Sequence, residues 1–319
     1  MHKRYLGLSP LPTKEANMSK QIGRRSFMKL AGLGVGVVFT SRLGLKPTDA
    51  MAAGMGTAAE DFFFLQMSDT HWGFSGEKVN PDAAGTLKKA VAAVNALEQA
   101  PDFIFFTGDL THSTDDPVER RRRLAEFKEI VSQLKVKEVR FTPGEHDASL
   151  DNGTAYKEYF GETHYTFAHK GIQFIVLDNV SDPRAALGQA QLDWLKLVLS
   201  GFSKDQKIVV FTHRPLFDLY PQWDWATKDG ADAIELLMPY QNVTVFYGHI
   251  HQENSHMTGH IPHYSAKSLM FPLPPPGSQP KRTPIPWDAE NPYKGMGFRE
   301  VKAAKEPAFA IQEFPVTKG

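Results

Sequence analysis

The stretch that decides the fold is FIFFTGDLTH, at residues 103–112. Its first five residues form an apolar, β-favouring run, which is typical of a buried strand. A glycine, Asp109 and His112 follow directly. In open α/β sheets the functional crevice lies at the carboxyl ends of the strands, so polar residues at this point are candidates for a site.

Four more predicted strands end in the same way, in acidic residues or histidines. The strands and the residues that follow them are Phe62–Met67 with Asp69 and His71, Val139–Thr142 with Glu145 and His146, Ile208–Thr212 with His213, and Val243–Tyr247 with His249 and His251. A single histidine near an apolar strand is more often a hydrogen-bonded structural group. Five strand ends of this kind in one chain predict that these side chains converge.

Between the strands lie segments with helical periodicity, and this alternation predicts an α/β fold. A sixth strand is expected at Ile172–Leu177, and a Pro-rich loop at 271–296 is followed by two closing strands within 297–315. The expected helices are Asp82–Gln99, Pro117–Leu134, Gln189–Leu199 and Ala231–Met238. Arg120–Arg123, in the second helix, is interpreted as a solvated, salt-bridged face, with a phosphate-binding patch as the alternative.

Composition narrows the classes of protein and of chemistry. The chain has 319 residues, with 23% charged and 41% apolar, as in ordinary globular proteins. Lys plus Arg and Asp plus Glu are 36 each, so the net charge gives no reason to expect a nucleic-acid partner. There is no cysteine, which excludes disulfides, thiolate catalysis and zinc–thiolate sites.

The N-terminal segment is expected to be an export signal rather than part of the fold. Arg24-Arg25 precedes a weakly apolar run, residues 30–40, that is too short to span a bilayer. The arginine pair resembles a twin-arginine signal, which carries folded proteins across the bacterial inner membrane. We expect residues 1–52 to be this signal with a disordered N-terminus, cleavage near Ala52, the twin-arginine machinery as partner, and a periplasmic or otherwise exported location without stable membrane insertion. A non-cleaved amphipathic helix is the alternative, and Met18 is an alternative start.

The types of residue at the strand ends point to metal ions. Imidazole and carboxylate without thiolate suit manganese, iron or zinc better than copper(I) or calcium. Seven donors exceed the needs of one tetrahedral zinc. The number fits two ions about 3.5–4 Å apart that share a carboxylate, an arrangement used in phosphoester hydrolysis.

The ordered motifs D-x-H, GD, G-x-H-D, H-x-P and G-H-x-H, from about Phe62 to His251, resemble those of the calcineurin-like metallophosphoesterases. The resemblance implies one domain over residues 60–319 with two packed, mostly mixed β-sheets flanked by helices, an α/β/β/α sandwich. By position, it implies two divalent or trivalent ions, with manganese or iron preferred and zinc as an alternative. The implied ligands are Asp69, His71 and His251 for one ion, Glu145, His213 and His249 for the other, and Asp109 for both.

The same resemblance implies hydrolysis of a phosphomonoester or phosphodiester by attack of metal-bound hydroxide. His146 would not be a ligand but a general acid near the leaving oxygen, where it would also stabilise the transition state. The substrate would be a small phosphoester, such as a nucleotide or a phospholipid-derived ester.

Two residues depart from the pattern of the family. Glu145 stands where the family normally has Asn, and its charge would hold the second metal more tightly and repel an anionic phosphate. A non-catalytic or weakly active metal-binding protein on the same scaffold is therefore the alternative function. His112 stands where many members have Asp; it is expected either to orient His146 or reach the substrate, or only to cap the turn.

Further residues are expected around the centre. Tyr220, Trp223 and Trp225 lie on a predicted loop after His213, where they would either stack on a base or aryl group of the substrate or anchor the loop in the core. Asp147 and Arg214 flank motif residues and are expected to hydrogen-bond groups around the ligands.

Overall fold

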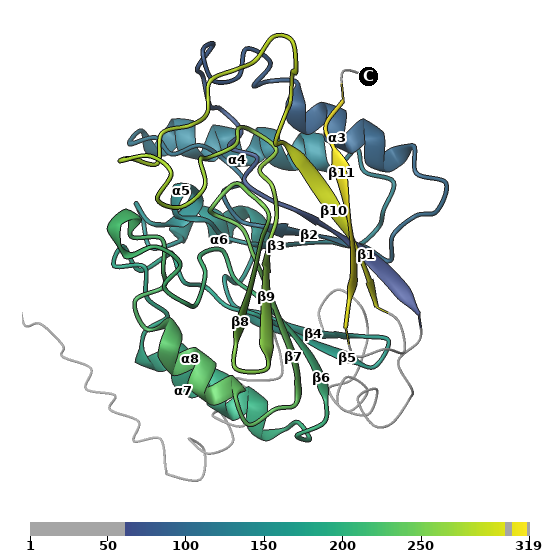
Figure 1. Cartoon of the computed structure of the whole chain (residues 1–319), viewed down its shortest axis with the longest axis vertical. Helices are drawn as coiled ribbons and strands as arrows, with labels where there is room; N and C mark the ends of the chain where they lie inside the picture. The colour runs from purple at the N-terminus through teal and green to yellow at the C-terminus, as the bar shows by residue number, and fades with distance from the viewer. Residues whose placement is uncertain (1–60, 304–307, 318–319) are drawn as a thin grey trace, which may run out of the picture. The chain divides into compact units, whose positions relative to one another are not determined.

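Two β-sheets form the framework of the structure, a computed structural model that describes residues 61–303 and 308–317 (Figure 1). The strand orders are β11–β10–β1–β2–β3 and β4–β5–β6–β7–β9–β8. The strands of the first sheet are β1 (Phe62–Met67), β2 (Phe103–Thr107), β3 (Val139–Thr142), β10 (Gly297–Ala303) and β11 (Ala310–Pro315). Those of the second are β4 (Tyr165–His169), β5 (Ile172–Val176), β6 (Lys207–Phe211), β7 (Asn242–Tyr247), β8 (Asn254–Thr258) and β9 (Ile261–Ser265).

Both sheets are mixed, as predicted. β1, β2 and β3 are parallel, and β10 and β11 add antiparallel pairs at one side. In the second sheet β5, β6, β7 and β9 are parallel, and β4 and β8 pair antiparallel at the two edges. The parallel strands therefore carry their carboxyl ends to a common edge of each sheet.

The two sheets pack face to face through aromatic side chains. Phe64 and Phe103 point from the first sheet into this layer, where their rings stack 4.9 Å apart. Phe105 of β2 stacks on Phe211 of β6, so the contact crosses from one sheet to the other. Because side chains alternate along a strand, the residues between these phenylalanines face the helices instead.

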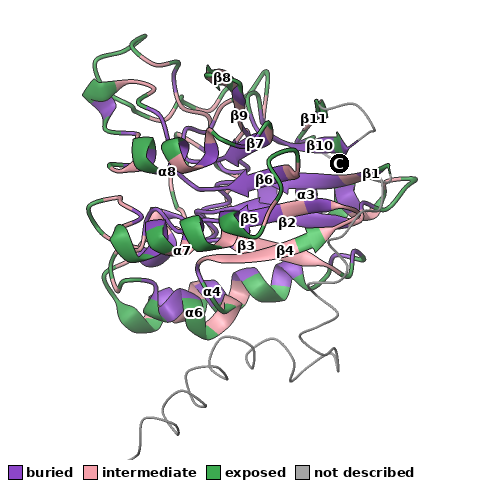
Figure 2. Cartoon of the chain, turned by 90° about the horizontal axis from the view of Figure 1, so that it is seen from below, coloured by how far each residue is buried: buried purple, intermediate pink, exposed green. Residues whose placement is uncertain are grey.

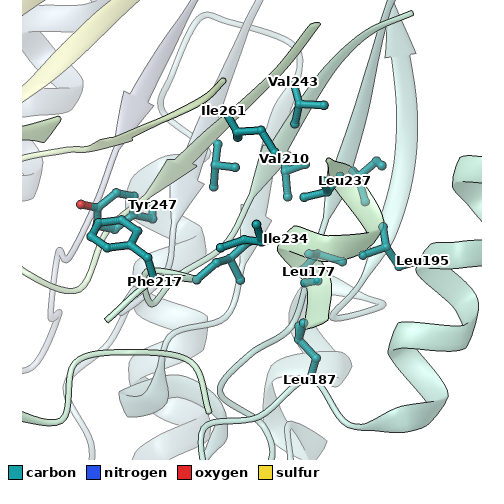
Figure 3. Close-up of a cluster of buried hydrophobic side chains, with 14 of the residues drawn as sticks. Leu177, Leu187, Leu195, Val210, Phe217, Ile234, Leu237, Val243, Tyr247 and Ile261 are labelled. Atoms are coloured by element: carbon teal, nitrogen blue, oxygen red, sulfur yellow. The ribbon is translucent and has the colours of Figure 1, made fainter. Parts of the chain in front are cut away.

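Helices cover the outer faces of the sheets. α3 (Thr86–Asn95) and α4 (Pro117–Val131) pack on the first sheet, and α7 (Gln189–Ser200) and α8 (Gly230–Leu237) pack on the second. Figure 3 shows Leu195 of α7 and Leu237 of α8 beside Val210 and Val243 of the second sheet. Figure 2 shows the exposed residues of these helices on their outer sides, while the strands are mostly buried. The predicted α/β/β/α arrangement is confirmed.

The predicted elements agree with the structure most closely at the strands that lead to the site. β1, β2 and β3 have the predicted bounds. β5 and β7 differ from their predicted bounds by one residue at one end, β6 is shifted by one residue at both ends, and β10 and β11 are the two closing strands predicted within 297–315. α3 is shorter than predicted at both ends, and α4 ends at Val131 rather than Leu134. β4, the hairpin of β8 and β9, α5 (Glu145–Ala148), α6 (Thr154–Phe160) and the 3-10 helix η1 (Pro221–Trp223) were not predicted.

The basic run Arg120–Arg123 of α4 was predicted to be a solvated, salt-bridged face, and this prediction is only partly correct. The helix begins at Pro117, where Asp116 caps it by accepting bonds from two backbone N–H groups. Arg121 and Arg122 are exposed and paired with glutamates. Arg120 and Arg123 are instead turned inward, with side chains that are 8% and 16% exposed.

The Pro-rich segment 271–296 contains no helix or strand, because proline supplies no backbone N–H for either ladder. It is held by hydrogen bonds such as Trp287 N to Lys78 O and Ile285 N to Pro272 O. The predicted export signal lies outside the described residues. Within residues 61–303 and 308–317, no helix has the length and apolar character needed to cross a membrane.

Candidate metal centre

The seven predicted ligand residues come together at the carboxyl ends of five strands. Asp69 and His71 follow β1, Asp109 follows β2, Glu145 opens α5 after β3, His213 follows β6, and His249 and His251 follow β7. Their donor atoms form two groups, each within 4.8 Å: Asp69, His71, Asp109 and His251, and Asp109, Glu145, His213 and His249. Asp109 belongs to both groups, as a carboxylate shared by two ions would.

In the first group two imidazoles face each other. The Nε2 atoms of His71 and His251 are 3.0 Å apart. Asp109 Oδ2 lies 3.5 Å from His71 Nε2, and Asp69 Oδ1 lies 3.4 Å from His251 Nε2. Two ring nitrogens this close require a proton or a cation between them, and the two carboxylates supply charge for a cation.

In the second group Glu145 spans two histidines. Its Oε2 lies 2.8 Å from His213 Nε2, and its Oε1 lies 2.9 Å from His249 Nδ1. His213 Nε2 is also 3.4 Å from Asp109 Oδ2. Glu145 thus reaches the position at which the resemblance implies a ligand, although it is longer than the usual asparagine.

Backbone carbonyls orient two of the imidazoles. His213 Nδ1 is 2.7 Å from Thr107 O, and His251 Nδ1 is 2.7 Å from Phe271 O. Because a carbonyl only accepts, each Nδ1 carries the proton and donates it. Nε2 of each ring therefore points into its group and is the nitrogen that the neutral ring would offer to a metal, which is how metal-binding histidines are usually fixed.

Several buried donor atoms in the second group make no hydrogen bond of normal geometry, namely Glu145 Oε2, His213 Nε2 and both ring nitrogens of His249. Three of them approach a charged partner within the group, while His249 Nε2 has no polar partner among the described residues. Burying unpaired polar atoms costs free energy, so such a set is unexpected in a purely structural cluster. A cation among these atoms would satisfy them, and the residues present therefore fit a metal site.

The backbone at the candidate ligands is strained. Asp69, His71, Asp109, His249 and His251 have φ between 40° and 67°, the left-handed region that non-glycine residues rarely adopt. They make up half of the ten described non-glycine residues with positive φ. Such strain persists where the surrounding structure imposes it, and it is concentrated at functional sites.

Two glycines allow the strand ends to approach one another. A Cβ atom on Gly144 would overlap the backbone N and Oδ1 of Asp109, and one on Gly248 would overlap Ser68 Oγ. Side chains at these two positions would push the candidate ligands apart. This close approach explains the glycines in the motifs GEHD and GHIH.

The charges in the second group stabilise one another. Burial would raise the pKa of Glu145, but His249 and His213 outweigh this effect and hold that pKa well below its ordinary value. Burial likewise lowers the pKa of His213, yet Asp109 and Glu145 raise it well above the usual range. The carboxylates are therefore held as anions, the form that binds a cation.

His146 lies beside the two groups and is partly exposed, at 26%. Its Nε2 is 4.0 Å from Asp109 Oδ2, so this edge of the ring faces the shared carboxylate. Its Nδ1 accepts a hydrogen bond of 3.1 Å from the backbone N–H of Ser113. The backbone N–H of His146 donates to Asp109 Oδ1, which ties the two residues together.

His112 lies against His146 rather than in solvent. The two rings stack with their centroids 4.8 Å apart, and His112 Nδ1 is 3.3 Å from His71 Nδ1. Phe74 contacts the ring of His112 edge-on, with centroids 5.2 Å apart. Burial lowers the pKa of His112 to about 4, so the ring is neutral near pH 7. These contacts favour the orienting role over the turn-capping alternative.

Asp147 is buried and connects two strand ends. Its carboxylate accepts hydrogen bonds from the backbone N–H groups of Leu110, Thr111 and Gly144, at 2.8–2.9 Å. Burial and the nearby Asp109 raise the pKa of Asp147 to about 6. Asp147 therefore holds the loops after β2 and β3 in register, as expected for a residue that supports the ligands.

The side chain of Arg214 is bonded to the loop after β6. Its guanidinium donates to the backbone carbonyls of Ala226 and Asp224, in the loop after β6. The residue is buried, so these carbonyls take the place of water. Arg214 therefore stabilises the loop.

The aromatic residues of that loop anchor it in the core. Trp225 is fully buried and Trp223 is 6% exposed, both in the hydrophobic cluster between the second sheet and α7 and α8. Tyr220 packs edge-on against Trp223, with ring centroids 5.1 Å apart. Burial between the sheet and the helices leaves neither indole face of Trp223 and Trp225 exposed, so their environment favours the loop-anchoring alternative over contact with the substrate.

Other residues at the centre were not predicted. Phe271 stacks on the ring of His71 and packs at a tilt against that of His251, with centroids 5.4 and 4.6 Å away. Ser68 Oγ donates to Asp69 Oδ2 at 2.5 Å, and Ser268 Oγ donates to Asp69 O at 2.8 Å. Ser68 could have been found from the sequence because it directly precedes Asp69. Phe271 and Ser268 lie in no motif that would identify them.

Residues 64–253 match the family of calcineurin-like phosphoesterases. This match covers more than half of the chain, and the chain belongs to that family. A probable cyclic nucleotide phosphodiesterase of Rhodococcus erythropolis is 26% identical over 226 residues, which are 66% of this chain and 71% of that protein.

A probable glycerophosphodiester phosphodiesterase of Arcobacter nitrofigilis is 30% identical over 160 residues, which are 47% of this chain. The alignment spans 56% of the length of the Arcobacter protein, little more than half. A dimetal phosphatase from Danio rerio has a similar structure, with a TM-score of 0.55 over 81% of this chain and 99% of that chain. Its sequence identity is 14%, so this likeness concerns the fold alone.

Proposed function

We propose that the protein is an exported phosphoesterase that holds two metal ions and hydrolyses a small phosphomonoester or phosphodiester. The observation that carries the proposal is the pair of donor groups joined by Asp109. Asp69, His71 and His251 would hold one ion, and Glu145, His213 and His249 would hold the other. Histidine and carboxylate donors favour manganese, iron or zinc.

The two ions, when bound, would polarise the phosphoryl group and acidify the attacking water. The chain itself orients the candidate ligands and His146. Thr107 O and Phe271 O fix the rings of His213 and His251. His146 presents Nε2 beside Asp109, where it would act on the leaving oxygen of the substrate.

Metal removal tests the proposal directly. The purified chain, loaded with Mn²⁺, Fe or Zn²⁺, is expected to hydrolyse aryl phosphate or bis-aryl phosphate, and chelation should abolish this activity until metal is restored. The rates on the two substrates would separate a monoesterase from a diesterase. The relatives named as phosphodiesterases favour the diester, and extending the panel to nucleotide and glycerophosphodiester substrates would identify the class.

A second candidate is a non-catalytic or weakly active metal-binding protein. It is favoured by Glu145, whose carboxylate adds a negative charge next to Asp109 and would repel an anionic phosphate. Two bound ions with no turnover on any ester in the panel would support this candidate and contradict the first.

Export is the part of the proposal that rests on sequence alone. Changing Arg24 and Arg25 together to lysine keeps the charge but removes the pair that a twin-arginine signal requires. In a bacterial host with this pathway, we expect the double variant to stay in the cytoplasmic fraction and the unchanged chain to reach the periplasm. Equal export of both would contradict a twin-arginine route.

A further inference from the structure

Two arginines of α4 hold the loop that follows Asp109. Arg123 Nη1 lies 2.8 Å from His112 O and 3.3 Å from Ser113 O. Arg120 Nη2 lies 3.1 Å from Thr114 O. The two residues are three positions apart, so they share a face of the helix and reach three consecutive carbonyls.

Both arginines are themselves fixed by carboxylates. Arg120 Nη1 pairs with Asp151 at 2.8 Å, and Arg123 Nε pairs with Glu119 at 2.7 Å. Hydrogen bonds from a charged, partly buried guanidinium are stronger than neutral ones. The loop 112–114 is therefore held more firmly than its lack of helix or strand would suggest.

This loop determines which nitrogen of His146 carries the proton. The backbone N–H of Ser113 can only donate, so His146 Nδ1 must accept. The neutral ring then has its proton on Nε2, the atom that faces Asp109. The ring of His112, in the same loop, stacks on His146 and limits its rotation.

We propose that Arg123, assisted by Arg120, is a positioning residue: by holding loop 112–114 it fixes the tautomer and orientation of His146, so that Nε2–H points at the substrate. This inference rests on the proposed phosphoesterase function. It makes Nε2–H of His146 the hydrogen-bond donor to the leaving oxygen, because Nδ1 is occupied by the Ser113 bond. The predicted general-acid role is thereby assigned to Nε2.

The test is Arg123→Gln in the full chain. In the Zn²⁺-loaded, ¹⁵N-labelled protein, the side-chain signals of His146 should show an unprotonated Nδ1 and a protonated Nε2, and the variant should show mixed tautomers. We expect kcat on an aryl phosphoester to fall about tenfold to a hundredfold. KM and the metal content per chain should stay unchanged. A general loss of structure would change both.

Arg121→Gln is the matched control, because Arg121 pairs with Glu158 but does not bond the loop. Arg123→Lys should recover part of the rate, since an ammonium can bond one carbonyl but lacks the guanidinium fork. If Arg123→Gln does not fold, the same spectrum and rate are measured on Arg123→Lys. An unchanged His146 spectrum, with kcat no lower than in Arg121→Gln, would overturn the proposal. The spectrum reports the tautomer of His146 without any turnover. A protein without phosphoesterase activity would therefore contradict the proposed function, while the His146 spectrum would still support or overturn the role of Arg123.

Discussion

Glu145→Asn is expected to leave one tightly bound metal ion per chain instead of two and to lower phosphoester hydrolysis at least about a hundredfold. Glu145 places one oxygen 2.8 Å from His213 Nε2 and the other 2.9 Å from His249 Nδ1. Asparagine is a methylene shorter and neutral, so it cannot reach both positions in this backbone. Metal analysis by mass spectrometry and the rate on a bis-aryl phosphate measure the two effects.

Glu145→Gln separates the charge of Glu145 from its length. Glutamine keeps the reach and one carbonyl oxygen, so we expect it to retain more of the second metal than asparagine does. The opposite result for Glu145→Asn, with both ions kept and a faster rate, would mean that the glutamate tunes the centre away from hydrolysis. That outcome would favour the non-catalytic alternative.

The strands that lead to the centre could be predicted because both of their faces are buried, which gives a continuous apolar run. In β1, Phe64 enters the layer between the sheets while Leu65 faces the helices, and both positions demand apolar residues. β8 and β9 offered no such run, since the hairpin is formed by NSHMT and IPHYS at the sheet edge. Pairing with β7 stabilises this hairpin, which local sequence does not reveal.

The candidate ligands could be predicted for a topological reason, because parallel strands carry their following residues to one edge. The role of the arginines could not. Arg120 and Arg121 are adjacent in sequence and identical in chemistry, yet one bonds Thr114 O and the other is exposed beside Glu158. Which arginine turns inward depends on how α4 packs on the first sheet. The burial of Trp225 likewise depends on the path of a loop without regular periodicity.

His146→Ala should lower kcat about a hundredfold to a thousandfold, the usual effect of removing one hydrogen-bond donor to developing charge. His146 Nε2 lies 4.0 Å from Asp109 Oδ2, close to the centre but outside both ligand groups. We therefore expect the metal content of the variant to match that of the unchanged chain. Steady-state kinetics on an aryl phosphoester, together with metal analysis of the same preparation, would measure both.

His146→Gln distinguishes hydrogen bonding from proton transfer. The amide nitrogen of glutamine lies near the position of Nε2 and can donate a hydrogen bond, but it cannot give up a proton. If His146 acts as a hydrogen-bond donor whose ring is fixed by Ser113, the glutamine variant should recover part of the rate that alanine loses. If His146 must transfer a proton, the two variants should be equally slow. The difference in rate between the unchanged chain and either variant should then shrink for substrates whose leaving group needs no protonation. Loss of metal from either variant would instead mean that the ring supports the ligands through Asp109, to which its backbone N–H is bonded.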